Sequence, residues 1–334
     1  MVPAGQVFAA MRQAESAGMP VRFPHPPQLY GLLLSKEWQA HLCQAKQYRV
    51  PPTTLVPRGA IARDPRRAAG TALEALDAIR SAVGARRHES AEGPGAASRV
   101  VAKLGHAWEA AHVRVLDRSA PPLTTALAEL CREVGSEHGC VIVQDFAPND
   151  FELRAYVVRG VAAHAVYSNF ERFDGDGYPR WFVQKSRREA VRDWLHGDDA
   201  CMDAAERRVI KLVEVWLAWL RSVSAAPVPA IRMDFLVKRT AAGKASVRTL
   251  ELTELGFSLL GWGDGPRQVL GALLESCFDD TGPSAAEAEM LRIQRECKPL
   301  RGQGKAGASE PLVSRKKRPR IDATPPSSSP STEV

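Results

Sequence analysis

The chain has 334 residues, of which 45% are hydrophobic and 25% are charged, an ordinary composition for a soluble globular protein. Its length allows a sizeable core and about two domains or lobes. No apolar run approaches the ~20 residues of a membrane span, and the first 20 residues lack the basic start and apolar block of a signal peptide. We therefore expect a protein inside the cell that has no membrane partner.

The positive charge is concentrated at the C-terminus. Residues 298–334 contain eight Lys and Arg against three acids, so this segment carries +5 of the net charge of +7. The folded body is nearly neutral, and nothing there predicts nucleic-acid binding. The basic run "SRKKRPRID", residues 314–322, predicts a nuclear localisation signal read by an import receptor. A contact with nucleic acid or another anionic surface, or simple solubilisation, are the alternatives, and the expected location is cytoplasmic and/or nuclear.

The six cysteines are scattered. None forms a C-x-x-C pair, and no histidine cluster joins them at zinc spacing. In a chain without a signal peptide we expect them to be reduced and structural.

The first third of the chain predicts helices and one short strand. Residues 1–20 form an amphipathic helix, and residues 21–57 form a compact opening unit with helical spacing followed by the strand "PPTTLV". A second helix covers 66–83. The polar, Gly-rich stretch 84–98 is a loop.

The middle of the chain is rich in strand signals. Apolar runs at 98–104 and 139–146 predict strands, and 151–170 predicts a hairpin that turns near Arg159 and Gly160. The turn at 173–180 resembles a calcium loop only superficially, because the other EF-hand ligands are missing.

The last part of the folded body alternates between the two types of element. The clearest helix covers 204–222, where Trp216 and Trp219 widen the apolar stripe of a core-packing helix. Strands at 230–239 and 245–255 flank the turn "TAAGK". We expect a final helix at 284–297, and the tail beyond it lacks the apolar content to fold.

The strand "FELRAYVV", residues 151–158, carries an acid and a base among apolar residues. Glu152, Arg154 and Tyr156 share one face, because side chains alternate along a strand. A solvated Glu–Arg pair is one interpretation. A charged face that binds a ligand is the other, since a buried charge is costly without a partner.

Acids on two neighbouring strands favour the second interpretation. Asp234 lies on one strand of a hairpin, and Glu251 and Glu254 lie on or just after the next. Facing carboxylates destabilise a sheet unless a cation neutralises them, and Mg²⁺ commonly uses one or two carboxylates plus substrate phosphates. Lys103 and Arg154 supply positive charge for such phosphates. The residues thus predict a site for Mg²⁺ and a polyphosphate.

The order and spacing of these motifs resemble the ATP-grasp superfamily over roughly residues 21–290. The most similar pattern is that of the carboxylate–amine ligases that add amino acids to protein chains, such as the ribosomal-protein glutamate ligases and the tubulin–tyrosine ligases. The motifs that carry the resemblance are "SKEWQAHLCQAKQYRVPPTTLV", the strand lysine of "VVAKL", "VIVQDF", "FELRAYV", "MDF" and "LELTELG".

The resemblance implies an α+β architecture, the ATP-grasp fold, in which two α/β lobes with antiparallel sheets clasp ATP. It implies a small pre-ATP-grasp unit at 1–60, an ATP-grasp domain at 61–297 and a disordered basic tail at 298–334.

The resemblance also implies roles for single residues. Lys103 would contact the α- and β-phosphates, Arg154 would act as the catalytic arginine, and Glu152 would face the nucleotide. The hinge strand would embrace adenine through its backbone, and the metal would be held by two acids and a third ligand that is either Thr253 or Glu254. The hinge residues are Val143, Gln144, Asp145 and Phe146, and the metal-binding set is Asp234, Glu251, Thr253 and Glu254.

Three departures from the family pattern bear on activity. Thr253 stands where the family has a metal-binding asparagine. The stretch "KLGHAWEAAHVRVL", where a phosphate-covering loop is expected, has the single glycine Gly105, with His106 and Trp108 nearby. No upstream lysine occurs between 58 and 98, where Arg66 or Arg67 could substitute.

We therefore expect an ATP- and Mg²⁺-dependent ligase that activates a carboxylate as an acyl phosphate and joins it to an amine or other nucleophile. The alternative is an ATP-binding protein with reduced catalytic capacity that acts as an assembly factor or chaperone. A nucleic-acid-binding module rests on the tail alone. No motif names the carboxylate, amine or protein acceptor. Four bases near the turn at 173–180 are candidates for binding an acidic acceptor, with a solvated basic face as the alternative: Arg172, Arg180, Lys185 and Arg187.

Overall fold

The computed structural model describes residues 4–19, 23–84, 98–105, 112–133, 139–173, 179–224, 226–254 and 257–278, with side chains omitted for 4–5, 171–173, 179–181 and 278. The expected helix at 284–297, the basic tail and most of the expected turn at 173–180 lie outside the described residues. Among the described residues, no helix is both long and apolar enough to cross a membrane.

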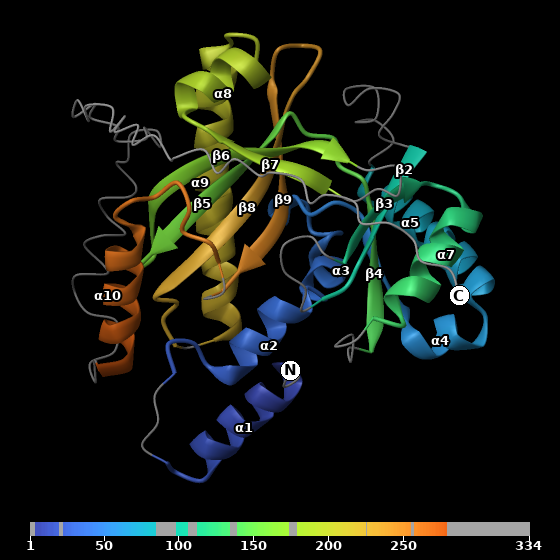
Figure 1. Ribbon diagram of the computed structural model, residues 1–334, viewed down its shortest axis with the longest axis horizontal. Helices are drawn as coiled ribbons and strands as arrows, with labels where there is room; N and C mark the ends of the chain where they lie inside the picture. The colour runs from blue at the N-terminus through green and yellow to red at the C-terminus, as the bar shows by residue number, and fades with distance from the viewer. Residues whose placement is uncertain are drawn as a thin grey trace, which may run out of the picture. The chain divides into compact units, whose positions relative to one another are not determined.

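The described elements include both helices and strands (Figure 1). The helices are α1 (Ala4–Ser16), α2 (Pro27–Ser35), α3 (Trp38–Leu42), the 3₁₀ turn η1 (Lys46–Tyr48), α4 (Arg58–Arg63), α5 (Pro65–Val83), α7 (Ala120–Leu130), α8 (Arg187–Trp194), α9 (Asp199–Val223) and α10 (Gly265–Phe278). The strands are β1 (Thr53–Pro57), β2 (Arg99–Lys103), β3 (Val113–Asp117), β4 (Cys140–Asp145), β5 (Phe151–Val158), β6 (Val161–Phe173), β7 (Pro179–Lys185), β8 (Ala230–Arg239) and β9 (Ala245–Thr253).

In the described part of the chain, β1, β4, β2 and β3 form a four-stranded antiparallel sheet in that order, here called sheet A. One face of sheet A packs on α5 and α7 (Figure 1). Alternating residues such as Val100, Ala102, Val141 and Val143 enter this core, as the period of two along a strand requires. The other face therefore presents the residues between them, which include Lys103.

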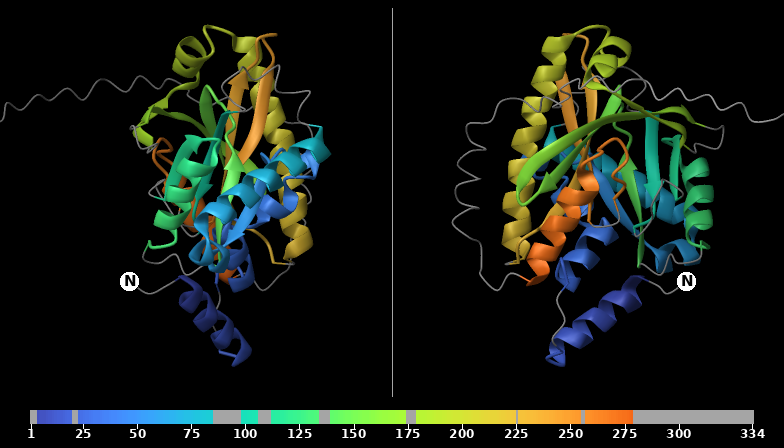
Figure 2. Two further views of the ribbon diagram at one scale, coloured as in Figure 1. Left: turned by 90° about the vertical axis from the view of Figure 1, so that its right-hand side faces the viewer. Right: turned by 60° about the vertical axis from the view of Figure 1, so that its left-hand side comes forward.

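The described strands β7, β6, β5, β8 and β9 form a five-stranded antiparallel sheet, here called sheet B. Helix α9 runs along one face in both views of Figure 2, and a large apolar core lies between them. Helix α10 packs on part of the other face through Val269 and Ala272, next to Tyr156 and Trp262. The rest of that second face carries the charged residues of the site described below.

The opening helices are fixed on the core of sheet B. The ring of Trp38 meets that of Trp216 edge to face at 5.0 Å, and both side chains are buried. Trp216 also donates a hydrogen bond to Thr249 Oγ1 at 3.0 Å, which satisfies its indole N–H. Helix α1 packs on α2 through a small cluster that includes Phe8 and Tyr30. The contacts of Trp38 hold the segment after α2 close to β9.

The α+β prediction is confirmed, as are the helices at 66–83 and 204–222 and the predicted strands. The hairpin turns at Arg159 and Gly160, where both residues have positive φ. Sequence patterns missed α4, β3, α7, β7, α8 and α10. Helix α10 exposes Leu270 and Leu274, so it lacks the single stripe that predicts an amphipathic helix. Helix α7 does bury one stripe, Leu123, Ala126, Leu127 and Leu130, which sequence reasoning overlooked.

Candidate functional site

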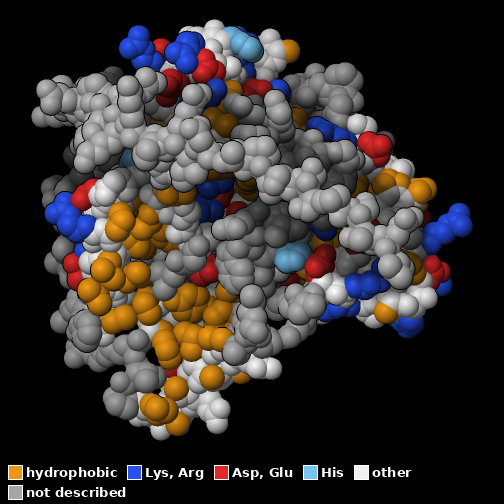
Figure 3. All heavy atoms as spheres, viewed as in Figure 1, with side chains coloured by type: hydrophobic (Ala, Val, Ile, Leu, Met, Phe, Trp, Pro, Cys, Tyr) orange, Lys and Arg blue, Asp and Glu red, His pale blue; other side chains and the backbone are white. Residues whose placement is uncertain are grey.

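A charged face on sheet B is built by alternation on three neighbouring strands. The register places Arg154 of β5 beside Asp234 of β8, and Asp234 beside Glu251 of β9. The residues between them enter the core under α9, and these include Phe151, Leu153 and Ala155. The predicted common face of Glu152 and Arg154 is confirmed. Figure 3 shows Lys or Arg and Asp or Glu side chains beside one another in a hollow near the middle of the molecule.

Glu152 and Arg154 form an ion pair at 3.1 Å, but not on the solvated face that the first interpretation of their strand supposed. The pair is nearly buried, with 12% of the Arg154 side chain and 9% of the Glu152 side chain exposed. Burial raises the pKa of Glu152 despite the nearby Arg154 guanidinium. Arg154 also stacks on Phe182, 4.4 Å from the ring centroid, and its buried Nε has no hydrogen-bond partner among the described residues. The pair thus leaves Arg154 with donor capacity to spare.

Arg232, which sequence reasoning passed over, holds Asp234 in a two-point contact. Its Nε and Nη2 each donate to one carboxylate oxygen of Asp234 at 2.8 Å, and both residues are buried. Burial by itself lowers the pKa of Arg232, but the Asp234 charge raises it well above its ordinary value. The signal was present in "AIRMDF", because Arg232 and Asp234 are two residues apart and so share a strand face.

Lys103 lies on sheet A and is 6% exposed. Its Nζ donates to Gln144 Oε1 at 3.2 Å. Its pKa is lowered to about 7, chiefly by burial and then by the Lys36 charge, while the Glu251 charge acts in the opposite direction. Lys103 therefore sits within the electrostatic reach of a carboxylate on sheet B.

Gln144 connects Lys103 to the opening unit. Its amide nitrogen donates to Thr53 Oγ1 at 2.7 Å and to Gln39 Oε1 at 3.3 Å. Gln39 in turn donates to the backbone oxygen of Leu250 on β9 at 2.8 Å. A continuous chain of hydrogen bonds thus joins Lys103 on sheet A to the strand that carries Glu251.

Lys36 is a second residue that sequence reasoning gave no role. It follows α2 directly, has a left-handed backbone (φ 57°), and its Nζ lies 2.9 Å from Glu251 Oε1. Burial raises the pKa of Glu251, but Lys36 first, and then Arg232 and Lys103, lower it, and the net pKa is below its ordinary value. The sequence signal was its place in "SKEWQAHL", the motif before the predicted lobes.

The predicted hinge residues lie on an interior strand. The N–H of Asp145 donates to the Pro52 oxygen at 2.9 Å, and the N–H of Phe146 donates to the Arg99 oxygen at 3.3 Å. Any backbone contact of these two residues with a base would therefore use their carbonyls. Val143 enters the core of sheet A, while the side chain of Gln144 points to Lys103.

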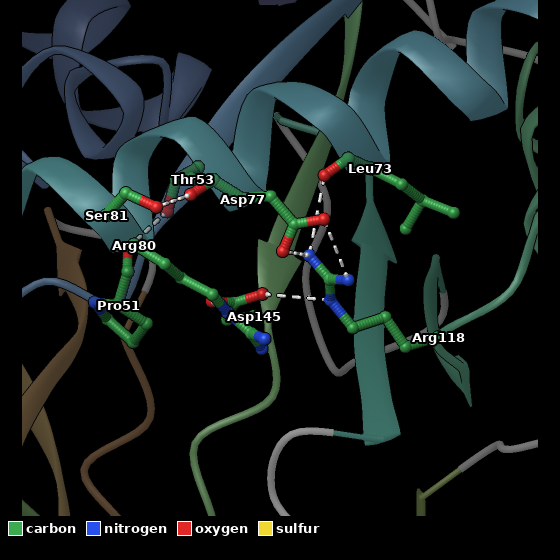
Figure 4. A network of polar contacts seen from close by, with 8 residues as sticks. All are labelled: Pro51, Thr53, Leu73, Asp77, Arg80, Ser81, Arg118 and Asp145. Atoms are coloured by element: carbon green, nitrogen blue, oxygen red, sulfur yellow. Dashed lines mark hydrogen bonds and ion pairs between the residues drawn. The ribbon is translucent and has the colours of Figure 1, made fainter. Parts of the chain in front are cut away.

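The carboxylate of Asp145 is bound inside the protein between two arginines (Figure 4). It accepts a hydrogen bond from Arg80 Nε of α5, and Arg118 Nε lies 3.8 Å from its other oxygen. Arg118 also pairs with Asp77 at 2.9 Å. Burial raises the pKa of Asp145 above its ordinary value although Arg80 and Arg118 oppose that shift. The network fixes the end of β4, from which the chain passes to sheet B.

The predicted metal ligands fit Mg²⁺ held jointly by protein and phosphates. Asp234 and Glu251 face each other, and the buried Thr253 Oγ1 has no hydrogen-bond partner among the described residues. Glu254 follows the strand and lies near Tyr30, whose pKa is raised first by burial and then by the Glu254 charge. Because side chains alternate along a strand, Thr253 shares the face of Glu251 and is favoured over Glu254 as the third oxygen ligand. No group of three or more Asp, Glu, His or Cys in the described ranges could hold a metal by itself. The remaining ligands would come from the nucleotide or water.

Other sequence candidates lie elsewhere. Arg187 pairs with Asp199, Asp203 and Glu206, and Lys185 pairs with Asp193, so these two bases are used within the protein. Arg66 and Arg67 are exposed at the start of α5. His106 and Trp108 lie outside the described residues, as do the side chains of Arg172 and Arg180.

Comparison with solved structures agrees with this architecture. D-cycloserine synthetase DcsG is 23% identical, with 79% of each chain covered and a TM-score of 0.50. The ATP-grasp ligase PsnB, complexed with a minimal precursor, is 18% identical over 81% of this chain and 70% of that chain (TM-score 0.38). D-alanine–D-alanine ligase from Bacillus anthracis is 12% identical over 86% and 76% (TM-score 0.43). No protein-family model matches the chain, and no curated protein matches it by sequence.

The fold and the site define a protein with two antiparallel sheets and a buried charged face suited to a polyphosphate and a divalent metal. The chain has the ATP-grasp fold, as the resemblance in its sequence implied.

Proposed function

We propose that the protein is an ATP- and Mg²⁺-dependent ligase that activates a carboxylate as an acyl phosphate and joins it to an amine or other nucleophile. One observation carries the proposal. The buried face of sheet B places Arg154 and Arg232 beside Asp234 and Glu251, and the hydrogen-bond chain through Gln144 and Gln39 ties Lys103 to the same region.

The basic side chains account for phosphate binding. Lys103 and Arg154 supply cationic donors that neutralise charge on a transferring phosphoryl group, and a buried position strengthens that interaction. Gln144 fixes the position of the Lys103 ammonium, while the stacking of Phe182 fixes the plane of the Arg154 guanidinium. Mg²⁺, held by Asp234, Glu251 and Thr253, would neutralise phosphate charge when bound.

The reaction of the acyl phosphate with an amine requires that water is excluded from the site, and it does not require a nucleophile from the protein. An acyl phosphate reacts readily with amines and with water, so a closed site protects it. The candidate face is suited to this because Glu152, Asp234, Arg232 and Lys103 are all less than one-tenth exposed. The substrate that supplies the carboxylate and the one that supplies the amine remain to be found by assay.

The proposal is tested by titrating a non-hydrolysable ATP analogue into the full chain with and without Mg²⁺, followed by an ADP-release screen over amino acids and peptides. We expect Mg²⁺-dependent binding that is lost in Lys103→Met and in Glu251→Gln, and retained in the surface variant Lys211→Met. Binding without any ADP release across the screen would leave nucleotide binding in place and contradict ligation.

One observation favours the alternative of an ATP-binding assembly factor or chaperone. Arg232 and Lys36 already balance the two carboxylates one to one, and Thr253 replaces the family's asparagine. A protein of that class would bind nucleotide, release no ADP with any acceptor, and change its melting temperature or partner binding when nucleotide is added.

A further inference from the structure

Lys36 occupies a position between the two sheets. Its backbone oxygen accepts from the Gln39 N–H at 3.1 Å, and its own N–H donates to Leu33 at 3.2 Å, so the main chain is held at both sides. The preceding Ser35 touches Gly105, just after Lys103, so closely that a Cβ on Gly105 would lie 2.9 Å from the Ser35 carbonyl carbon and still closer to its oxygen. The opening unit therefore contacts the Lys103 arm of sheet A and, through Lys36, the metal-ligand strand β9.

The Lys36 ammonium is paired with Glu251, a predicted metal ligand whose carboxylate must be free to bind a metal. Its Nζ is 2.9 Å from Glu251 Oε1, and the two side chains are 10% and 27% exposed. Glu251 is also the register partner of Asp234, whose two oxygens are both taken by Arg232. Each predicted acidic ligand thus has its own side-chain cation.

Arg232 and Lys36 differ in how they are held. Arg232 and Asp234 lie on one strand and make two parallel hydrogen bonds, a geometry that leaves little freedom. Lys36 reaches Glu251 from a different element through a flexible four-carbon stem and acts as a point charge. Its head can therefore leave Glu251 by side-chain rotation alone, with the backbone still anchored.

We propose that Lys36 is the cation that balances Glu251 in the absence of a divalent metal and that it gives up this carboxylate when metal binds, so that Lys36 sets the metal affinity of the site. The inference rests on the proposed function in that it assigns Glu251 to a metal. A cationic ammonium and a divalent cation cannot both occupy one carboxylate oxygen without strong repulsion, so the ion pair opposes metal binding. The protein would then bind metal tightly only when phosphate charge is also present to receive the displaced ammonium.

The test measures Mn²⁺ binding by electron paramagnetic resonance, first for the metal alone and then with a non-hydrolysable ATP analogue. Lys36→Met removes the charge and keeps the stem, Lys36→Arg keeps the charge, and Lys211→Met makes the same charge change at an exposed position on α9. We expect Lys36→Met to bind Mn²⁺ about tenfold tighter, while the other two variants match the wild type. Melting curves verify that each variant is folded.

The outcomes separate this inference from the proposed function. Unchanged or weaker Mn²⁺ binding by folded Lys36→Met overturns the role of Lys36, even if nucleotide binds normally. If Lys36→Met binds Mn²⁺ more tightly but the wild type binds no nucleotide, the role of Lys36 is supported and the proposed function is overturned. If Lys36→Met does not fold, Lys36→Gln replaces it. In a Glu251→Gln background, either substitution at Lys36 should leave the residual Mn²⁺ binding unaltered, because the carboxylate for which Lys36 and the metal compete is gone.

Discussion

Lys103 donates a hydrogen bond to Gln144 at 3.2 Å, and this contact is the first link of a chain that reaches the other sheet. Gln144 passes to Gln39, and Gln39 binds the Leu250 oxygen on β9. Every group in the chain has a consistent donor or acceptor role. A buried ammonium is thereby positioned toward a carboxylate-bearing strand more than a hundred positions away in sequence, and this arrangement makes the behaviour of Lys103 predictable.

Lys103→Met is expected to separate binding from stability. Nucleotide affinity falls by about tenfold to a hundredfold, because a charge-assisted contact to phosphate is lost. Stability at pH 8 stays equal or rises, because folding of the variant no longer requires a lysine to lose its proton on burial. Isothermal titration and urea denaturation measure the two effects. A variant that loses stability and nucleotide affinity together would indicate that Lys103 is mainly a structural residue.

The pKa of Lys103 predicts proton uptake on nucleotide binding. The pKa of Lys103 in the folded protein is about 7, below the ordinary 10.5. Above pH 7 the Lys103 amine is therefore largely neutral in the nucleotide-free protein, whereas a bound phosphate favours its protonated form. Titrations at pH 8.5 in buffers of different ionisation enthalpy should show uptake of close to one proton, and affinity should fall as pH rises. The unfolded chain binds the extra proton between pH 7 and 10.5, so the Lys103 contribution to stability increases with pH in that window. Equal enthalpies in all buffers would contradict this.

Arg232→Met should destabilise the protein strongly. It leaves the carboxylate of Asp234 buried without its two-point partner, which typically costs about 3–5 kcal/mol. Arg192→Met is the matched control, since Arg192 forms an exposed pair with Asp193 and its loss should hardly change the free energy of unfolding. Urea denaturation at pH 7 compares them, and similar effects for both variants would show that Asp234 relaxes into contact with water.

Gly105→Ala should disturb both folding and nucleotide binding. The new methyl group would overlap the Ser35 carbonyl, so the chain after Lys103 must shift, at a cost of about 1–3 kcal/mol. Gly70→Ala, inside α5 with open space at its Cβ, should instead stabilise by about 0.5–1 kcal/mol. Thermal melting and nucleotide titration measure both variants. Wild-type behaviour of Gly105→Ala would mean that the opening unit moves away easily.

Arg80→Met tests the network around Asp145. Removing the nearer of two arginines leaves a nearly buried carboxylate with a single partner at 3.8 Å, and we expect a loss of about 2–3 kcal/mol. Arg67→Met on the exposed face of the same helix is the control and should change stability by less than about 0.5 kcal/mol. Denaturant unfolding measures the difference between the two. If Arg80→Met behaves like Arg67→Met, then Arg118 alone is sufficient for Asp145.

Sequence patterns alone predicted most of the fold that bears on the site. Strand alternation predicted that Glu152 and Arg154 share a face, and motif order predicted that Lys103, Asp234 and Glu251 belong to one site. The same reasoning missed Arg232, although it obeys the alternation, because "MDF" drew attention to the acid alone. It also missed α10, whose apolar residues surround more than one face, and α7, although Leu123, Leu127 and Leu130 have helical spacing.

What the sequence by itself determined is which side chains leave the core, because the periods of strand and helix follow from local geometry. What only the tertiary structure decided is which charges meet. Lys36 and Glu251 are more than two hundred residues apart, and no local rule pairs them. Their contact arises because Trp38 packs on Trp216 and holds the end of α2 against β9. Long-range packing of apolar side chains thus determines the partners of the charged ones.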